Sequence, residues 1–223
     1  MAEIKAPRKK KIVLVEDHPL FRERLAHLIN KDLGMAVCGE ADNIHEALAL
    51  ITATSPDVVI VDITLRGSSG LELAKDIRAQ RLPTLVLMLS MHEESLYAER
   101  ALRAGARGYI MKNQASSEII HAIRRVLSGD VYVSERVTSM LLHGLARKPS
   151  SMTVSGIESL TDRELEVLQL TGRGRNTREI AEAMHLGETT VDTYRARIKA
   201  KLGLKNAAEL YQRAAEWVQE QGC

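Results

Sequence analysis

The chain has 223 residues, 45% of them hydrophobic and 27% charged, as in an ordinary folded protein of one large or two modest domains. Its net charge of +2 is too small to predict nucleic-acid binding by itself. The two cysteines indicate no disulfide framework, and no apolar run approaches the roughly 20 residues of a membrane helix. We therefore expect a cytoplasmic protein without membrane contact, beginning with a basic, solvated tail at residues 1–10.

Residues 11–130 alternate between short apolar runs and stretches with helical spacing. The apolar runs predict strands at 12–15, 35–38, 58–62, 84–89 and 107–111, and each is followed by a predicted helix. Five strands that alternate with helices and short loops favour a parallel, doubly wound sheet, because each crossover returns over one face of the sheet.

Chemically active side chains follow four of these strands. Glu16 and Asp17 follow the first strand, Asp62 ends the third, Ser90 follows the fourth and Lys112 follows the fifth. Taken alone, Asp62 is equally well explained as an aspartate that caps a helix or orders a loop. Ligands of open α/β sheets bind at the carboxyl ends of the strands, so the set together predicts one cleft.

Three carboxylates in one cleft repel each other and require a positive partner. A hard divalent cation such as Mg²⁺ accepts oxygen ligands, and Lys112 supplies a second positive charge. Ser90 could hydrogen-bond an oxyanion. This combination suits phosphoryl transfer, with Asp62 as the nucleophile that forms an aspartyl phosphate.

Residues 11–130 resemble the receiver domain of two-component response regulators through Glu16-Asp17, Asp62, Ser90 and Lys112. The resemblance implies a flavodoxin-like (βα)5 fold in which Asp62 accepts phosphate from a sensor histidine kinase and Lys112 pairs with that phosphate. It also assigns a magnesium site and a switch pair. The magnesium ligands are Glu16, Asp17, Asp62 and the backbone carbonyl of Thr64, and the switch pair is Ser90 and Tyr109.

Two positions depart from the common receiver pattern. Asn113 follows Lys112 where many receivers have proline, so the family's cis peptide is not expected here. Leu65-Arg66-Gly67 replaces the common Met-Pro-Gly. Neither departure touches the acidic residues.

Residues 131–158 change in character and predict a linker. Residues 134–146 have helical spacing, and the Ser-rich stretch 148–156 is typical of a flexible tether.

Residues 159–223 predict four short helices. Thr161 with Glu164, and Asn176 with Glu179, have the spacing of helix-capping residues. Leu186-Gly187 predicts the tight turn between the second and third helices, and this pair of helices forms a helix-turn-helix arrangement. Residues 156–223 hold 10 basic and 11 acidic residues, but the basic ones concentrate on the helix predicted over 188–202. Such a run is consistent with a solvated face as well as with DNA contact.

Leu160 to Trp217 resemble the LuxR-type helix-turn-helix, through motifs that include Thr190-Val191 and Lys201-Leu202-Gly203. Together with a receiver, this module is typical of NarL/FixJ-type response regulators. The resemblance places helix 188–202 in the major groove, with Asp192 where the family often has lysine. The implied DNA contacts are Thr189, Thr190, Asp192, Thr193, Arg195, Ala196, Arg197, Lys199 and Lys201.

The sequence therefore predicts a phosphorylation-controlled transcription factor. It would bind double-stranded DNA, form a homodimer when phosphorylated or DNA-bound, and catalyse only its own phosphorylation and dephosphorylation. A haloacid-dehalogenase-type phosphatase is one alternative, although Thr64 stands where that family has its second aspartate. A regulator that ignores phosphate and uses the receiver only as a dimerisation scaffold is the other.

Overall fold

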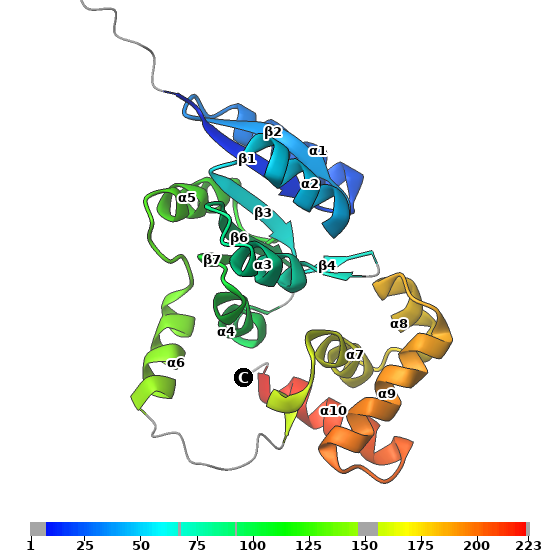
Figure 1. Ribbon diagram of the computed structural model, residues 1–223. Helices are drawn as coiled ribbons and strands as arrows, with labels where there is room; N and C mark the ends of the chain where they lie inside the picture. The colour runs from blue at the N-terminus through cyan, green and yellow to red at the C-terminus, as the bar shows by residue number, and fades with distance from the viewer. Residues whose placement is uncertain (1–7, 67, 92, 147–155, 222–223) are drawn as a thin grey trace, which may run out of the picture. The chain divides into compact units, whose positions relative to one another are not determined.

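A computed structural model describes residues 8–66, 68–91, 93–146 and 156–221 (Figure 1). The chain divides into two compact units, Met1–Ala146 and Arg147–Cys223. Residues 1–7 of the predicted tail and 148–155 of the predicted tether lie outside the described residues. No helix in the described ranges has the length and apolar character needed to cross a membrane.

The first unit is built on five parallel strands that are hydrogen-bonded in the order β2-β1-β3-β6-β7 (Figure 1). Every residue of the central strand β3 is buried. This order confirms the predicted doubly wound α/β fold of the flavodoxin-like kind. The strands are β1 (Lys10–Val15), β2 (Met35–Ala41), β3 (Val58–Asp62), β6 (Leu85–Ser90) and β7 (Gly108–Met111).

Helices cover both faces of this sheet. Ile12 and Leu14 of β1 pack in one core cluster with Leu25 of α1 and Ile123 of α5. Successive strand residues point to opposite faces, so the equally buried Val13 lies on the other face. The helices are α1 (Pro19–Asn30), α2 (Ile44–Thr54), α3 (Gly70–Ala79), α4 (Glu94–Ala104) and α5 (Ser116–Leu127).

Two features of the first unit differ from the sequence-based expectation. A small antiparallel hairpin, β4 (Thr64–Leu65) with β5 (Ser68–Ser69), follows β3. The predicted linker helix, α6 (Glu135–Ala146), is grouped with this unit: its Val137 is buried, and the Ser134 amide before it donates to Glu94 of α4 over 2.7 Å. Two-residue strands and a packed linker have no periodic signal of their own in the sequence.

The second unit contains a 3-10 turn (Ile157–Ser159) and the helices α7 (Asp162–Gly172), α8 (Thr177–Met184), α9 (Glu188–Leu202) and α10 (Ala207–Gln221). Reciprocal capping boxes open α7 and α8, as predicted. The predicted turn differs in detail, because His185 rather than Gly187 has the positive φ, of 53°. At the α7–α10 crossing, a Cβ on Gly172 would lie 2.3 Å from the Ala214 carbonyl oxygen, so only glycine allows this close approach.

Candidate functional site: a strand-end acid cluster and a helix-turn-helix surface

The carboxyl ends of β1 and β3 bring three acidic side chains together. Glu16, Asp17 and Asp62 are each no more than 4% exposed, and one ligand atom from each lies within 4.8 Å of the others. His18 joins this group, with its Nδ1 atom 2.9 Å from a carboxylate oxygen of Glu16 and 2.9 Å from one of Asp17. The predicted convergence of the acids is therefore present in the structure. His18 was not predicted, although its place directly after the acid pair was a usable signal.

Lys112, directly after β7, reaches across the sheet edge into the acid cluster. Its Nζ atom lies 2.8 Å from Asp62 Oδ2 and 2.6 Å from Glu16 Oε2, and its side chain is only 6% exposed. The same Nζ lies 4.8 Å from the centre of the Phe21 ring, a cation–π contact. One ammonium group thus bridges two buried carboxylates.

The charge balance of the cluster affects the pKa of Asp62. Burial raises the pKa of Asp62 to about 7, against the opposing effect of the Lys112 charge, and the Glu16 carboxylate adds a smaller increase. Burial lowers the pKa of Lys112, but Asp62 and Glu16 more than reverse this and leave it raised. The backbone amide of Thr64 also hydrogen-bonds the Asp62 carboxylate. Added positive charge at this place would favour the ionised, nucleophilic form of Asp62.

Gly70, at the start of α3, fixes the space behind Asp62. Its amide donates to the Ile63 carbonyl over 2.8 Å. A Cβ on Gly70 would lie 2.0 Å from the carbonyl oxygen of Asp62 and 2.7 Å from Val61 Cγ1. Any larger residue would therefore displace the backbone that carries the Asp62 carboxylate.

Ser90 and Tyr109 occupy neighbouring strands beside the acid cluster. Ser90 ends β6 and is fully buried, and its hydroxyl is hydrogen-bonded to that of Tyr109 on β7. The Tyr109 ring is only 1% exposed, and burial raises its pKa, so the phenol keeps its proton. The predicted switch pair is thus in direct contact, with the aromatic ring on the inside.

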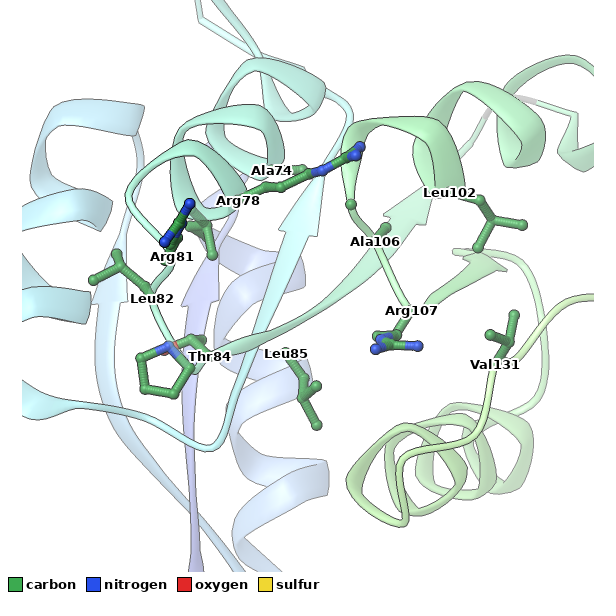
Figure 2. A pocket seen from close by; sticks show the side chains of 13 residues that line it. Ala74, Arg78, Arg81, Leu82, Thr84, Leu85, Leu102, Ala106, Arg107 and Val131 are labelled. Carbon is green, nitrogen blue, oxygen red and sulfur yellow. The ribbon is translucent and has the colours of Figure 1, made fainter.

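A surface groove at the opposite edge of the sheet is separate from the acid cluster. Figure 2 shows the side chains that line it, which include Arg78, Arg81 and Arg107, together with Leu85 at the amino end of β6. Arg78 Nη1 donates to the Arg103 carbonyl at the end of α4 over 2.6 Å. Arg78 therefore caps the C-terminal end of α4. The groove contributes no group to the predicted site.

In the second unit, α9 presents one buried and one exposed face. Val191 and Ile198 are buried, as predicted for core positions of the helix-turn-helix. Most of the predicted DNA contacts share the exposed face: Thr189, Thr190, Asp192, Thr193, Ala196 and Arg197 are exposed, and Lys199 is half-buried.

The structure does not place Arg195 and Lys201 as predicted. Arg195 is 8% exposed, donates to Thr177 Oγ1 over 2.7 Å and lies 5.3 Å from the centre of the Tyr211 ring. We therefore remove Arg195 from the proposed DNA surface, because its guanidinium ties α9 to α8 and α10. Lys201 is exposed, but its Nζ lies 2.6 Å from Glu164 Oε2 and is already paired within the unit.

Burial of Glu164 raises the pKa of that carboxyl group, but hydrogen bonds from Lys201 and Thr161 more than offset this and leave the pKa below its ordinary value. The Glu164 side chain also accepts from the Thr161 amide over 2.7 Å, which closes the capping box of α7. Lys201 thus stabilises the start of α7, and we propose no phosphate contact for it.

An acid cluster at the carboxyl ends of the strands in one unit and a helix-turn-helix in the other define the class of two-domain regulators that couple chemistry in one domain to DNA contact by the other. A family model described as a response regulator receiver domain matches residues 12–124. A model described as bacterial regulatory proteins, luxR family, matches residues 158–214. The chain belongs to the NarL/FixJ-type two-component response regulators.

Individual relatives agree with this assignment. Transcriptional activator protein ExaE of Pseudomonas putida is 37% identical over 92% of this chain and 95% of its own length. The virulence factors putative positive transcription regulator BvgA of Bordetella pertussis is 34% identical over 90% of this chain and 94% of its own length. The crystal structure of a LuxR-family two-component response regulator from Aurantimonas is 34% identical, covers 62% of this chain and 99% of its own, and superposes with a TM-score of 0.57.

Proposed function

We propose that Asp62 accepts a phosphoryl group from the phosphohistidine of a sensor histidine kinase. The observation that carries this proposal is the Asp62 carboxylate, buried at the end of β3 among two other acids and 2.8 Å from Lys112. An oxygen of Asp62 would bond to phosphorus while the bond from phosphorus to the histidine nitrogen breaks, and that nitrogen keeps the electron pair. Lys112 would then pair with the new negative charge.

The donor set of the cluster fits a hard divalent cation, which we assign as Mg²⁺. Carboxylate oxygens of Glu16, Asp17 and Asp62 are the ligands such an ion prefers, and they already lie within 4.8 Å of one another. When bound, the ion would neutralise charge that develops on the phosphoryl oxygens. The predicted ligation by the Thr64 carbonyl stays a prediction.

The contacts around Ser90 support a route for the signal away from the acid cluster. A phosphoryl group adds about −1.5 to −2 charge and three acceptor oxygens, which would attract the Ser90 hydroxyl away from Tyr109. Tyr109 is hydrogen-bonded to the segment that precedes α6, since its backbone amide donates to the Tyr132 carbonyl over 2.8 Å. Movement of Tyr109 would therefore act on the residues that lead into α6.

In the second unit, we propose that the exposed face of α9 enters the major groove of double-stranded DNA. Exposed Arg197 and half-buried Lys199 would contact phosphates, and threonines near the start of the helix would reach base edges. A homodimer, favoured by phosphorylation, would read two half-sites. The expected cytoplasmic location follows from this contact with DNA.

Labelling with acetyl phosphate and Mg²⁺ tests the proposed phosphoacceptor. We expect the intact mass of the full chain to increase by one phosphoryl group, and Asp62→Asn to abolish the increase. Asp57→Asn, directly before the same strand, is the matched control and should label normally. Label that persists in Asp62→Asn would assign the phosphoacceptor to another residue.

The two alternatives make different predictions for the same preparation. A haloacid-dehalogenase-type phosphatase would turn over an aryl phosphate continuously. It uses a second acid two residues after the nucleophile, where this chain has Thr64 in the hairpin strand β4. A phosphate-independent regulator would bind DNA equally well with and without Asp62. The buried acid cluster favours the phosphoacceptor over both, because three carboxylates close together are costly to bury without a function.

A further inference from the structure

Asp192 is an exposed acid on the face of α9 that we propose for DNA contact. A carboxylate beside phosphates is repelled unless it meets a hydrogen-bond donor. The ordinary structural reasons for an acid on a helix are an ion pair within the helix or a favourable position at the helix N-terminus. Neither applies to Asp192.

The positions that could pair with Asp192 along the helix hold no available cation. Three residues before it is Thr189, and four residues after it is Ala196. Three residues after it is Arg195, whose guanidinium is turned inward onto Thr177 and the Arg175 carbonyl. Among the described residues, the Asp192 carboxylate forms no ion pair.

The helix N-terminus does not explain Asp192 either. The favourable effect of the helix dipole on an acid is confined to the first turn, and Glu188 occupies that position in α9. Asp192 is the fifth residue of the helix, beyond the first turn.

We propose that Asp192 is a specificity-determining residue that accepts a hydrogen bond from the N4 amino group of a cytosine in the major groove. This inference rests on the proposed function of α9. Cytosine offers only a donor at that edge, whereas guanine offers two acceptors that would repel a carboxylate. The short side chains of Thr189, Thr193 and Ala196 around it leave the carboxylate open to a base edge.

The test is selection of binding sites from random double-stranded DNA by the full chain and its variants. Wild type should select cytosine at one position of each half-site, and Asp192→Ala should reduce that preference by roughly fivefold or more. Asp192→Asn should shift the preference toward adenine, since asparagine pairs with adenine N6 and N7. Glu220→Gln, which also removes one negative charge but lies on α10, should leave the preference unchanged.

Binding to non-specific DNA gives a second measurement. Because Asp192 is repelled by phosphates, Asp192→Ala should bind non-specific DNA at least as tightly as wild type. A cytosine preference that is unchanged in both Asp192 variants would overturn this inference while leaving DNA recognition by α9 intact. If wild type selects no sequence at all, the proposed DNA-binding function itself fails.

Discussion

Without Mg²⁺, Lys112→Met should lower the free energy of unfolding of the chain by about 3 kcal/mol near neutral pH. The substitution keeps most of the side-chain volume but leaves Glu16 and Asp62 buried together without their bridging ammonium, which now lies 2.6 and 2.8 Å from them. Proton uptake by Asp62, whose pKa burial already raises to about 7, would limit the loss. Denaturant unfolding followed by circular dichroism measures the change.

Adding Mg²⁺ should stabilise Lys112→Met more than it stabilises wild type, since the ion would replace the missing positive charge. Lys10→Met is the matched control. Lys10 also pairs with an aspartate, Asp57 at 2.9 Å, but its side chain is 51% exposed, so we expect a loss of no more than about 1 kcal/mol and no dependence on Mg²⁺. Equal Mg²⁺ stabilisation of wild type and Lys112→Met would contradict a shared role for the lysine and the cation.

Arg195→Met should destabilise the helical unit by about 2–3 kcal/mol. The change removes the hydrogen bond to Thr177 at 2.7 Å and the contact with the Tyr211 ring, and both groups lie on other helices. Thermal unfolding of the full chain should show a transition at a lower temperature for this variant than for wild type.

Arg197→Met, two residues later on the same helix, is the matched control for Arg195. Arg197 is exposed, so its loss should change stability by no more than about 0.5 kcal/mol. It should instead weaken binding to all DNA sequences. The salt dependence of the DNA affinity should fall by the amount expected for the loss of about one phosphate contact. The opposite pattern, with Arg195 controlling affinity and Arg197 controlling stability, would reverse our assignment of the two side chains.

The sequence was sufficient to predict the sheet and the acid cluster because both depend on strongly patterned segments. The apolar strand before Asp62 is buried throughout, and strand ends of a parallel sheet meet at one edge. The hairpin at Thr64–Leu65 was not predictable, since two-residue strands have no periodicity. The inward position of Tyr109 depends on packing between β6 and β7, which the sequence pattern does not determine.

Helical periodicity indicates a buried position for Arg195, although its side chain is charged. Val191 and Ile198 were correctly assigned to the core, and Arg195 lies four residues after one and three before the other, on the same helical stripe. Its charge favoured an exposed, phosphate-binding interpretation. Burial was possible because Thr177, the Arg175 carbonyl and the Tyr211 ring receive the guanidinium.

The proposed function requires that a phosphoryl group on Asp62 controls DNA binding by α9. Its most direct test is the affinity of the full chain for a DNA site selected from a random pool, before and after treatment with acetyl phosphate and Mg²⁺. We predict that phosphorylation tightens binding about 5- to 150-fold in wild type and has no effect in Asp62→Asn. Equal affinity of phosphorylated and unphosphorylated wild type would contradict control of DNA binding by phosphorylation of Asp62.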